Sequence, residues 1–241
     1  MKGLILAAGL GSRLKGYTSQ IPKALVRING RPILSYQIDA LLINEVEDIY
    51  IVIGYKGKEI LNYINKNYRD INVTFINNKE YNTSNSSYSF WLSHKYLLES
   101  SYIHLNCDII ISPIVIKLII ESKYDNVICI KTDDELTDNM ELVKLEKNTI
   151  VKMDNSYFDE AIGKAYGVAK FSDKSTFLLS MKVEEYIKSG DKNQNYYGLI
   201  RQAIFELNYN VIDCTDEILF ETNTVSDLKK VEKLIINHEE I

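Results

Sequence analysis

The chain has 241 residues, 46% hydrophobic and 25% charged, with a formal net charge of −5. This composition is typical of a globular protein with one sizeable core, and the acidic balance argues against a nucleic-acid-binding face, which needs clustered Lys and Arg. No apolar run reaches the ~18–20 residues of a membrane-spanning helix and no signal-peptide pattern opens the chain, so we expect a cytoplasmic protein with neither a nucleic-acid nor a membrane partner.

The first predicted strand, residues 4–8, runs directly into a glycine-rich loop, Gly9-Leu10-Gly11-Ser12-Arg13. Glycines let a backbone approach a ligand closely and present its N–H groups to an anion. Arg13 and Lys23 add two cations around this loop. The spacing excludes a dinucleotide fingerprint, whose third glycine would stand at Leu14, and it also excludes a Walker A loop. We expect this segment to bind an anion, and a nucleoside triphosphate fits it best.

Strands alternate with helices up to residue 132. The predicted strands cover residues 48–54, 73–77, 102–111 and 126–132, and the predicted helices cover 33–43, 58–68, 85–97 and a run that Pro113 opens. This order predicts βαβ units in an α/β fold, with a mainly parallel, Rossmann-like sheet flanked by helices. Ligands bind such sheets beyond the carboxyl ends of the strands, which is where the glycine loop lies.

The pattern changes from residue 133 onwards. Residues 141–145 and 149–153 predict a hairpin, followed by a strand over 165–171, helices over 174–188 and 196–207, a strand over 211–214 and a closing helix over 228–236. No linker or repeat separates the two halves. We therefore predict one domain over residues 1–241, with a nucleotide-binding half (1–132) and a smaller mixed half (133–241) that binds the acceptor and completes the metal site.

Asp108 follows Leu105-Asn106-Cys107 and is interpreted as the carboxyl end of a strand. A carboxylate at the carboxyl end of a strand faces the ligand crevice and is suited to hold Mg²⁺, although in isolation it would more often be solvated. Arg13 and Lys23 are the candidate catalytic residues, because nucleotidyl transfer needs cations that stabilise phosphate charge. A phosphate monoester with a second pKa near ~6 is already dianionic at neutral pH, so no general base is required.

Two motifs carry a resemblance to known enzymes. Leu6–Leu14 (Leu-Ala-Ala-Gly-x-Gly-Ser-Arg-Leu) and Pro22–Leu25 (Pro-Lys-Ala-Leu) resemble the sugar-nucleotide and related nucleotidyltransferases, which have a GT-A-like fold. Asn85-x-x-Tyr88-Ser89 resembles the bacterial phosphocholine cytidylyltransferases and their relatives that act on aminoethylphosphonate and on phosphorylated precursors of capsule, a cell-surface polysaccharide. The resemblance implies nucleotide contacts at Leu6, Ala7, Ala8, Gly9, Gly11, Ser12, Asn85, Tyr88 and Ser89.

The resemblance also implies a second metal ligand at Asn223, where the family usually has Asp. Glu221 has the same strand parity as Asn223 and could serve as a further metal or acceptor group. Phosphocholine enzymes enclose their quaternary ammonium in aromatic and acidic groups. In the corresponding segment here, Met140 stands where a tryptophan is expected and Glu141 follows it. Tyr196 and Tyr197 could add aromatic rings, although tyrosines that open a helix more often pack in the core. A small phosphorylated acceptor is expected, without choline being specified.

These observations predict a Mg²⁺-dependent cytidylyltransferase that transfers CMP from CTP to a small phosphorylated metabolite by direct in-line attack and releases pyrophosphate. A sugar-1-phosphate uridylyl- or thymidylyltransferase is the alternative enzyme. A non-catalytic nucleotide-binding regulator is the alternative of another class, to which Asn223 would be a clue. A monomer or a homodimer is expected.

Overall fold

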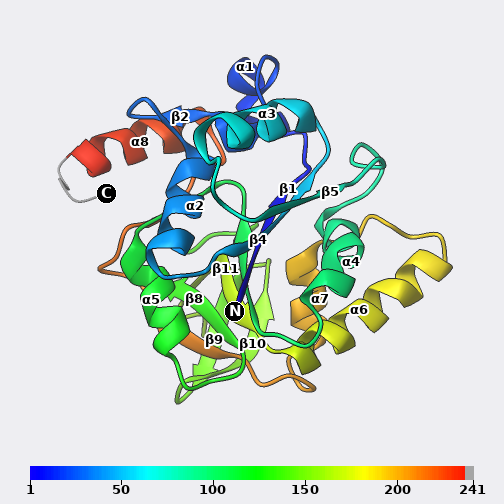
Figure 1. Ribbon diagram of the computed structural model, residues 1–241. Coiled ribbons are helices and arrows are strands. Elements are labelled where there is room, and N and C mark those ends of the chain that lie inside the picture. Colours follow the sequence, from blue (N-terminus) through cyan, green and yellow to red (C-terminus); the bar gives the residue numbers. More distant parts are fainter. Residues whose placement is uncertain (237–241) are drawn as a thin grey trace.

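A nine-stranded sheet forms the centre of the molecule in this computed structural model, which describes residues 1–236 (Figure 1). The strand order is β5-β4-β1-β6-β11-β8-β12-β10-β9. The first four neighbours pair in parallel, whereas β11 is antiparallel to both β6 and β8. This confirms the predicted α/β fold with a smaller mixed part. The strands are β1 (Lys2–Ala7), β4 (Asp48–Ile53), β5 (Val73–Asn77), β6 (Tyr102–Asn106), β8 (Val127–Lys131), β9 (Leu142–Glu146), β10 (Thr149–Asp154), β11 (Gly163–Phe171) and β12 (Asn210–Asp213).

Helices cover both faces of the sheet (Figure 1). One face packs against α2 (Ile33–Ile43), α3 (Gly57–Asn67) and α5 (Pro113–Glu121), and the other against α4 (Ser86–Leu97), α6 (Asp173–Lys188) and α7 (Tyr196–Gln202). Residues alternate between these faces along β1, because successive side chains of a strand point in opposite directions. Leu4 and Leu6 join the core under α4, whereas Ile5 and Ala7 join the core under α2.

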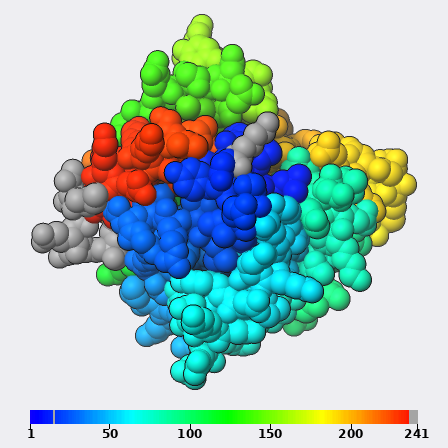
Figure 2. Space-filling view, turned by 90° about the horizontal axis from the view of Figure 1, so that it is seen from above, coloured from blue at the N-terminus to red at the C-terminus, as the bar shows by residue number. Residues whose placement is uncertain are grey.

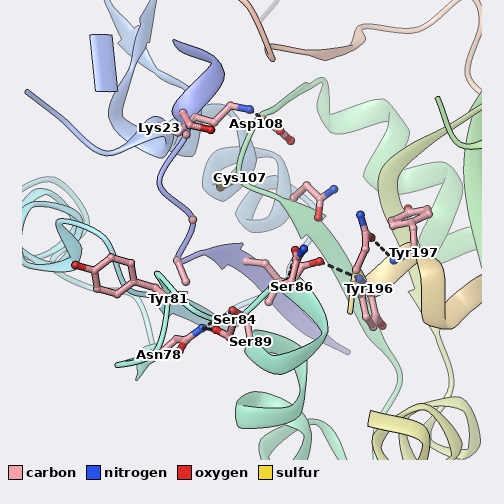
Figure 3. A pocket seen from close by; sticks show the side chains of 18 of the residues that line it. Lys23, Asn78, Tyr81, Ser84, Ser86, Ser89, Cys107, Asp108, Tyr196 and Tyr197 are labelled. Carbon is pink, nitrogen blue, oxygen red and sulfur yellow. Dashed lines mark hydrogen bonds and ion pairs between the residues drawn. The ribbon is translucent and has the colours of Figure 1, made fainter. Parts of the chain in front are cut away.

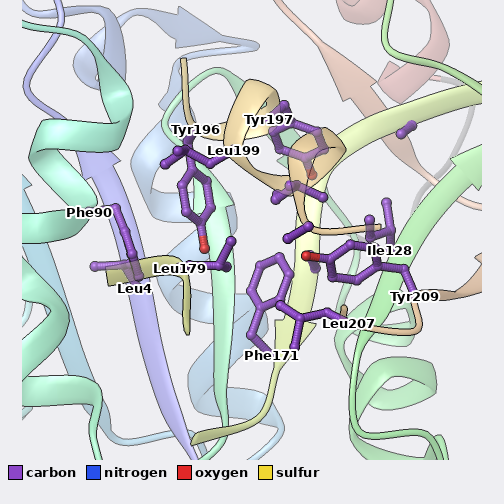
Figure 4. Close-up of a cluster of buried hydrophobic side chains, with 14 of the residues drawn as sticks. Leu4, Phe90, Ile128, Phe171, Leu179, Tyr196, Tyr197, Leu199, Leu207 and Tyr209 are labelled. Atoms are coloured by element: carbon purple, nitrogen blue, oxygen red, sulfur yellow. The ribbon is translucent and has the colours of Figure 1, made fainter. Parts of the chain in front are cut away.

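The core under α4, α6 and α7 is rich in aromatic rings (Figure 4). The rings of Phe90 and Tyr196 have centroids 4.8 Å apart, and the hydroxyls of Tyr102 and Tyr196 are hydrogen-bonded at 2.6 Å. Phe171 meets Tyr209 edge to face with centroids 6.2 Å apart. This packing fixes the start of α7, which borders the ligand crevice.

The predicted strand over residues 102–111 is in fact two strands. β6 ends at Asn106, a turn follows at Cys107 and Asp108, and β7 (Ile109–Ile111) leaves the main sheet to pair with β13 (Leu219–Glu221). The apolar run continues because all three isoleucines of β7 are buried, so hydrophobicity alone does not reveal the break. The turn brings Asp108 beside a segment more than a hundred residues later in the chain.

The C-terminal helix α8 (Val225–Ile236) lies next to the N-terminal segment (Figure 2). Its residues Leu228 and Val231 share a small core with Leu14, Val26 and Ile110. The helix begins three residues before the predicted start, and α7 ends at Gln202 rather than at residue 207. The short β2 (Arg27–Ile28) and β3 (Arg31–Pro32) form a hairpin, and α1 (Lys15–Thr18) completes the elements. Within residues 1–236 no helix has the length and apolarity needed to span a membrane.

Candidate active site

A cavity of about 310 Å³ opens at the carboxyl ends of β1, β5 and β6 (Figure 3). Lys23 and Asp108 lie at one end of the cavity, Asn78, Ser84 and Ser89 lie at another, and Tyr196 and Tyr197 border it from α7. We call it the nucleotide cavity. Of the nucleotide contacts implied by the resemblance, it is lined by Leu6, Ala8, Gly9, Gly11, Ser12, Asn85 and Ser89.

The glycine loop is tightly folded at Gly11. Gly11 has φ +64°, and a Cβ there would lie 2.9 Å from Thr18 Cγ2 and 3.1 Å from Lys23 Cβ. The Thr18 hydroxyl donates to the Gly11 carbonyl at 3.0 Å. A side chain at this position would be both strained and crowded, so glycine is required for the loop to fold back over Lys23.

Lys23 contacts one residue from each of the two predicted halves of the chain. Its side chain is only 8% exposed, and Nζ lies 2.7 Å from Asp108 Oδ2 and 2.9 Å from Asn223 Oδ1. The Thr222 backbone N–H and hydroxyl both donate to the Asp108 carbonyl at 2.9 Å. The pairing of β7 with β13 therefore brings together Asp108 and Asn223, which the sequence predicted as metal ligands.

Glu221 belongs to the same cluster. Its Oε2 accepts from Asn223 Nδ2 at 3.3 Å and lies 2.7 Å from Lys164 Nζ. Burial raises the pKa of Glu221, against the lowering effect of Lys164. The ion pair with Lys164 therefore holds the Glu221 carboxylate beside Asn223, one of the two predicted metal ligands.

The side-chain oxygen atoms of Asp108 and Asn223 are of the kind that binds Mg²⁺. Within residues 1–236 no three His, Cys, Asp or Glu side chains cluster as a complete metal cage. Mg²⁺ does not need such a cage, because it keeps waters and binds through one or two protein oxygens together with substrate phosphates. Asp108 Oδ1 is buried and has no hydrogen-bond partner in residues 1–236, so it can accept a cation. The residues that would hold the ion are Asp108 and Asn223.

Two residues implied by the resemblance lie outside the nucleotide cavity. Ala7 faces the opposite core, as the alternation of β1 requires. Tyr88 stacks on Trp91 with ring centroids 5.7 Å apart and donates its hydroxyl to Glu80 at 2.8 Å. These contacts keep its ring in the α4 packing, and we do not retain Ala7 or Tyr88 as direct side-chain contacts. Asn85, by contrast, caps α4 by accepting from the Ser86 N–H at 2.8 Å.

A second cavity of about 150 Å³ adjoins the first, and we call it the acceptor cavity. Its lining includes Met140, Glu141 and Tyr197 of the predicted acceptor residues, whereas Tyr196 lines only the nucleotide cavity. Burial raises the pKa of Glu141, although Arg201 Nη1 lies 2.6 Å from its carboxylate and acts in the opposite direction. Arg13, which is exposed, lines both cavities.

Sequence reasoning missed several polar residues of the site. Asn106 and Asn195 line both cavities, Asn78 lines the nucleotide cavity and Lys164 the acceptor cavity. Asn78 and Asn106 stand at the carboxyl ends of β5 and β6, a position that itself predicts ligand contact. Lys164 and Asn195 gave no comparable signal, because their places depend on the pairing of β11 and on the start of α7.

Comparisons with known proteins agree with this geometry. The choline-phosphate cytidylyltransferase of Streptococcus pneumoniae is 29% identical over 240 residues, which cover 98% of this chain and 99% of that protein. The CTP:phosphoglutamine cytidylyltransferase of Campylobacter jejuni is 30% identical over 188 residues, covering 71% and 73%. The solved structure of the S. pneumoniae CTP:phosphocholine cytidylyltransferase superposes with a TM-score of 0.77 over 97% of this chain and 98% of that one, at 24% identity.

The predicted resemblance to nucleotidyltransferases, and to the choline-phosphate cytidylyltransferases among them, is thus confirmed. The model of the MobA-like NTP transferase domain matches residues 3–180, which include the glycine loop, Lys23 and Asp108. This chain therefore belongs to the family of MobA-like NTP transferase domains.

Proposed function

We propose that this protein is a CTP-dependent cytidylyltransferase, which transfers CMP from CTP to a small phosphorylated acceptor and releases pyrophosphate. The observation that carries the proposal is the junction of the two cavities, which share Arg13, Asn106 and Asp108 beside Lys23. An α-phosphate at this junction would face the glycine loop on one side and the acceptor on the other. The cytidylyltransferase activity named for the relatives supports the same reaction.

In the proposed reaction, an oxygen of the acceptor phosphate attacks the α-phosphorus in line. A new P–O bond forms as the bond to the pyrophosphate oxygen breaks. Arg13 and Lys23 would stabilise the charge on the α-phosphate and on the departing pyrophosphate, since both are within the cavity lining. Mg²⁺ held by Asp108 and Asn223 would neutralise phosphate charge when bound. The attacking phosphate is already dianionic, so the chain needs no general base.

The far end of the nucleotide cavity is the proposed base site. Asn78 Nδ2 donates to the hydroxyl oxygens of Ser84 and Ser89, at 3.1 Å each, and Asn78 Oδ1 accepts from the Glu80 N–H. The carbonyls of Leu6 and Ala8 accept from Cys107 and Tyr55 and keep one lone pair each. Such acceptors match the amino group of cytosine, whereas the carbonyl oxygen of uracil would face them acceptor to acceptor and lose its own hydrogen bond.

Initial rates with five nucleotides test the proposal. With Mg²⁺ and saturating acceptor, CTP is expected to exceed UTP, dTTP, ATP and GTP by about 5- to 150-fold in pyrophosphate release, because an unsatisfied buried polar group costs roughly 1–3 kcal/mol. UTP or dTTP equal to CTP would contradict the cytidylyl assignment and favour transfer to a sugar 1-phosphate.

We further propose that the reaction takes place in the cytoplasm, within one domain over residues 1–241 acting as a monomer or homodimer. Cys107, Cys129 and Cys214 are free thiols, as expected in a reducing compartment. The CMP-activated product would suit use as a precursor of cell-surface polysaccharide.

A further inference from the structure

Four asparagines line the acceptor cavity: Asn106, Asn139, Asn195 and Asn223. A carboxamide carries no charge and offers both donors and acceptors of hydrogen bonds. Asn106 and Asn195 also line the nucleotide cavity, so they border the junction where the acceptor phosphate must enter. The part of the acceptor beyond its phosphate would therefore meet four uncharged carboxamides, beside the charged groups of Arg13, Asp108, Glu141, Lys164 and Glu221.

The carboxylates of this cavity are already paired with cations. Glu141 lies 2.6 Å from Arg201 Nη1, and Glu221 lies 2.7 Å from Lys164 Nζ. Asp108 is likewise paired with Lys23. An ammonium group that enters the cavity would have to compete with these internal cations for every carboxylate.

Within residues 1–236, the lining of the acceptor cavity also forms no aromatic enclosure. Tyr197 is the one aromatic residue among the described residues that line it, and it is 4% exposed. Its hydroxyl donates to the Tyr166 carbonyl. A quaternary ammonium group is stabilised by the faces of several aromatic rings, and a single buried ring supplies little of this stabilisation.

Asn106 is held in one orientation by its surroundings. Nε2 of the buried His104 lies 3.0 Å from Asn106 Oδ1. Because a carboxamide oxygen only accepts, this contact requires the ring proton on Nε2 and turns Nδ2 of Asn106 away from the histidine. The His104 ring is itself fixed against Tyr196, with centroids 4.7 Å apart.

Gly167 gives Asn106 the space that it occupies. Val168 of β11 pairs with Leu105, so Gly167 lies opposite Asn106 across the two strands. A Cβ on Gly167 would lie 2.3 Å from Asn106 Nδ2 and 2.7 Å from its Cβ. The asparagine therefore fills a place beside the acceptor cavity that only a glycine partner leaves open.

We propose, on the basis of the proposed function, that the acceptor is a phosphate ester of an uncharged group bearing hydroxyls, and that Asn106, positioned by His104, is a residue that selects it. Asn106 Nδ2 would donate to the acceptor beside the junction. His104 is a positioning residue in this arrangement.

A substrate panel tests the acceptor class. Pyrophosphate release from CTP would be measured with glycerol phosphate, inositol phosphate, phosphoglutamine, phosphoethanolamine and phosphocholine. We expect kcat/KM for glycerol phosphate or inositol phosphate to exceed that for phosphoglutamine, phosphoethanolamine and phosphocholine by about 20-fold or more, since a site built from hydrogen-bonding groups rejects ligands that leave them unpaired. A higher value for any of the three ammonium-bearing acceptors would overturn the inference and leave cytidylyl transfer standing. No release with any of the five would overturn the proposed function itself.

Two variants of His104 test the positioning role with the best acceptor of the panel. His104→Phe keeps a ring against Tyr196 but removes the donor to Asn106, whereas His104→Gln, the matched control, keeps an amide donor. We expect the Phe variant to raise the acceptor KM by about fivefold or more while the CTP KM stays within twofold, and the Gln variant to recover most of the loss. Equal changes in both KM values, or no difference between the two variants, would contradict the role.

Discussion

The ammonium group of Lys23 balances the negative charge of the Asp108 carboxylate and also contacts the uncharged Asn223. We expect Lys23→Ala and Arg13→Ala each to lower kcat by about 10²-fold or more, since removing one preorganised charge-stabilising group typically costs that much. Steady-state rates of pyrophosphate release measure the effect, with circular dichroism as the control for folding. A loss below threefold in both variants would show that the glycine loop is not the site.

Asp108 is the only carboxylate that contacts Lys23 among the described residues. Asp108→Asn is expected to abolish Mg²⁺-dependent activity, because amides at both 108 and 223 would leave little charge for the cation. A Mg²⁺ titration of the rate measures this. An unchanged Mg²⁺ dependence would exclude Asp108 as a ligand.

Asn223→Asp is the matched variant with the opposite change of charge. Asn223 Nδ2 donates to Glu221, so a carboxylate at 223 would lose this hydrogen bond and face a like charge. We expect the variant to be active and to bind Mg²⁺ more tightly, with a lower Tm than the parent protein in the absence of Mg²⁺ that recovers when the ion is added. A Tm that does not respond to Mg²⁺ would place the cation elsewhere.

At the scale of the elements, the start of α8 fixes the backbone of Asn223. Asp227 Oδ2 accepts from the Asn223 N–H at 2.9 Å and from the Thr224 N–H at 2.7 Å, and the Thr224 hydroxyl accepts from the Asp227 N–H at 3.2 Å. This is the reciprocal cap that the Thr224 and Asp227 spacing indicates. Asp227 therefore has a structural role.

Removing this cap tests its contribution. Asp227→Ala is expected to lower the free energy of unfolding by about 0.5–2 kcal/mol, measured by urea denaturation, because two N–H groups lose their acceptor. Ser226→Ala, in the exposed first turn, is the control and should change the stability by less than about 0.5 kcal/mol. Equal stability of both variants would mean that the cap contributes nothing to the fold.

Most elements could be predicted because their signals are local. Residues 33–43 and 73–77 have the predicted bounds, and Pro113 opens α5 as expected. The departure of β7 from the main sheet could not be predicted, since it depends on pairing with β13, whose residues lie far along the chain. Pairing between strands that are distant in the chain produces no periodic pattern in the sequence of either strand.

The residues of the site likewise divide into those that local sequence motifs predict and those that only the fold reveals. Arg13, Lys23 and Asp108 follow from motifs and from the ends of predicted strands. Asn106 and Lys164 become visible only once β11 lies between β6 and β8, because this order places their side chains beside the same cavity. The role of a residue that depends on sheet order can be assigned only once the fold is known.

At the scale of the whole molecule, His104 links stability to pH. Burial lowers its pKa to about 4 from an ordinary value of 6.5, so the folded protein holds it neutral while the unfolded chain binds a proton. The stabilisation is complete above pH 6.5 and is lost as the pH falls from 6.5 towards 4. At pH 5 the loss is about 2 kcal/mol relative to pH 7.

Comparing the parent protein with His104→Gln isolates this effect. Burial raises the pKa of Glu141 and of Glu221, and these groups act in the opposite sense, favouring the folded state as the pH falls towards 4.5. Both are present in the two proteins, so their contribution cancels in the difference. Urea denaturation between pH 7 and pH 5 should show a smaller loss of stability for the variant, and parallel curves would contradict the assignment.

The position of the Lys23 ammonium between Asp108 and Asn223 has a thermodynamic consequence. A divalent cation and an ammonium group repel each other, so the ion enters most easily when the lysine has turned to a nucleotide phosphate. Binding of either CTP or Mg²⁺ would therefore favour binding of the other. Because such coupling is reciprocal, the factor by which CTP raises the affinity for Mg²⁺ must equal the factor by which Mg²⁺ raises the affinity for CTP. A lysine that pairs with Asp108 and Asn223 in the free protein would make the two proposed binding events cooperative without any movement of the fold.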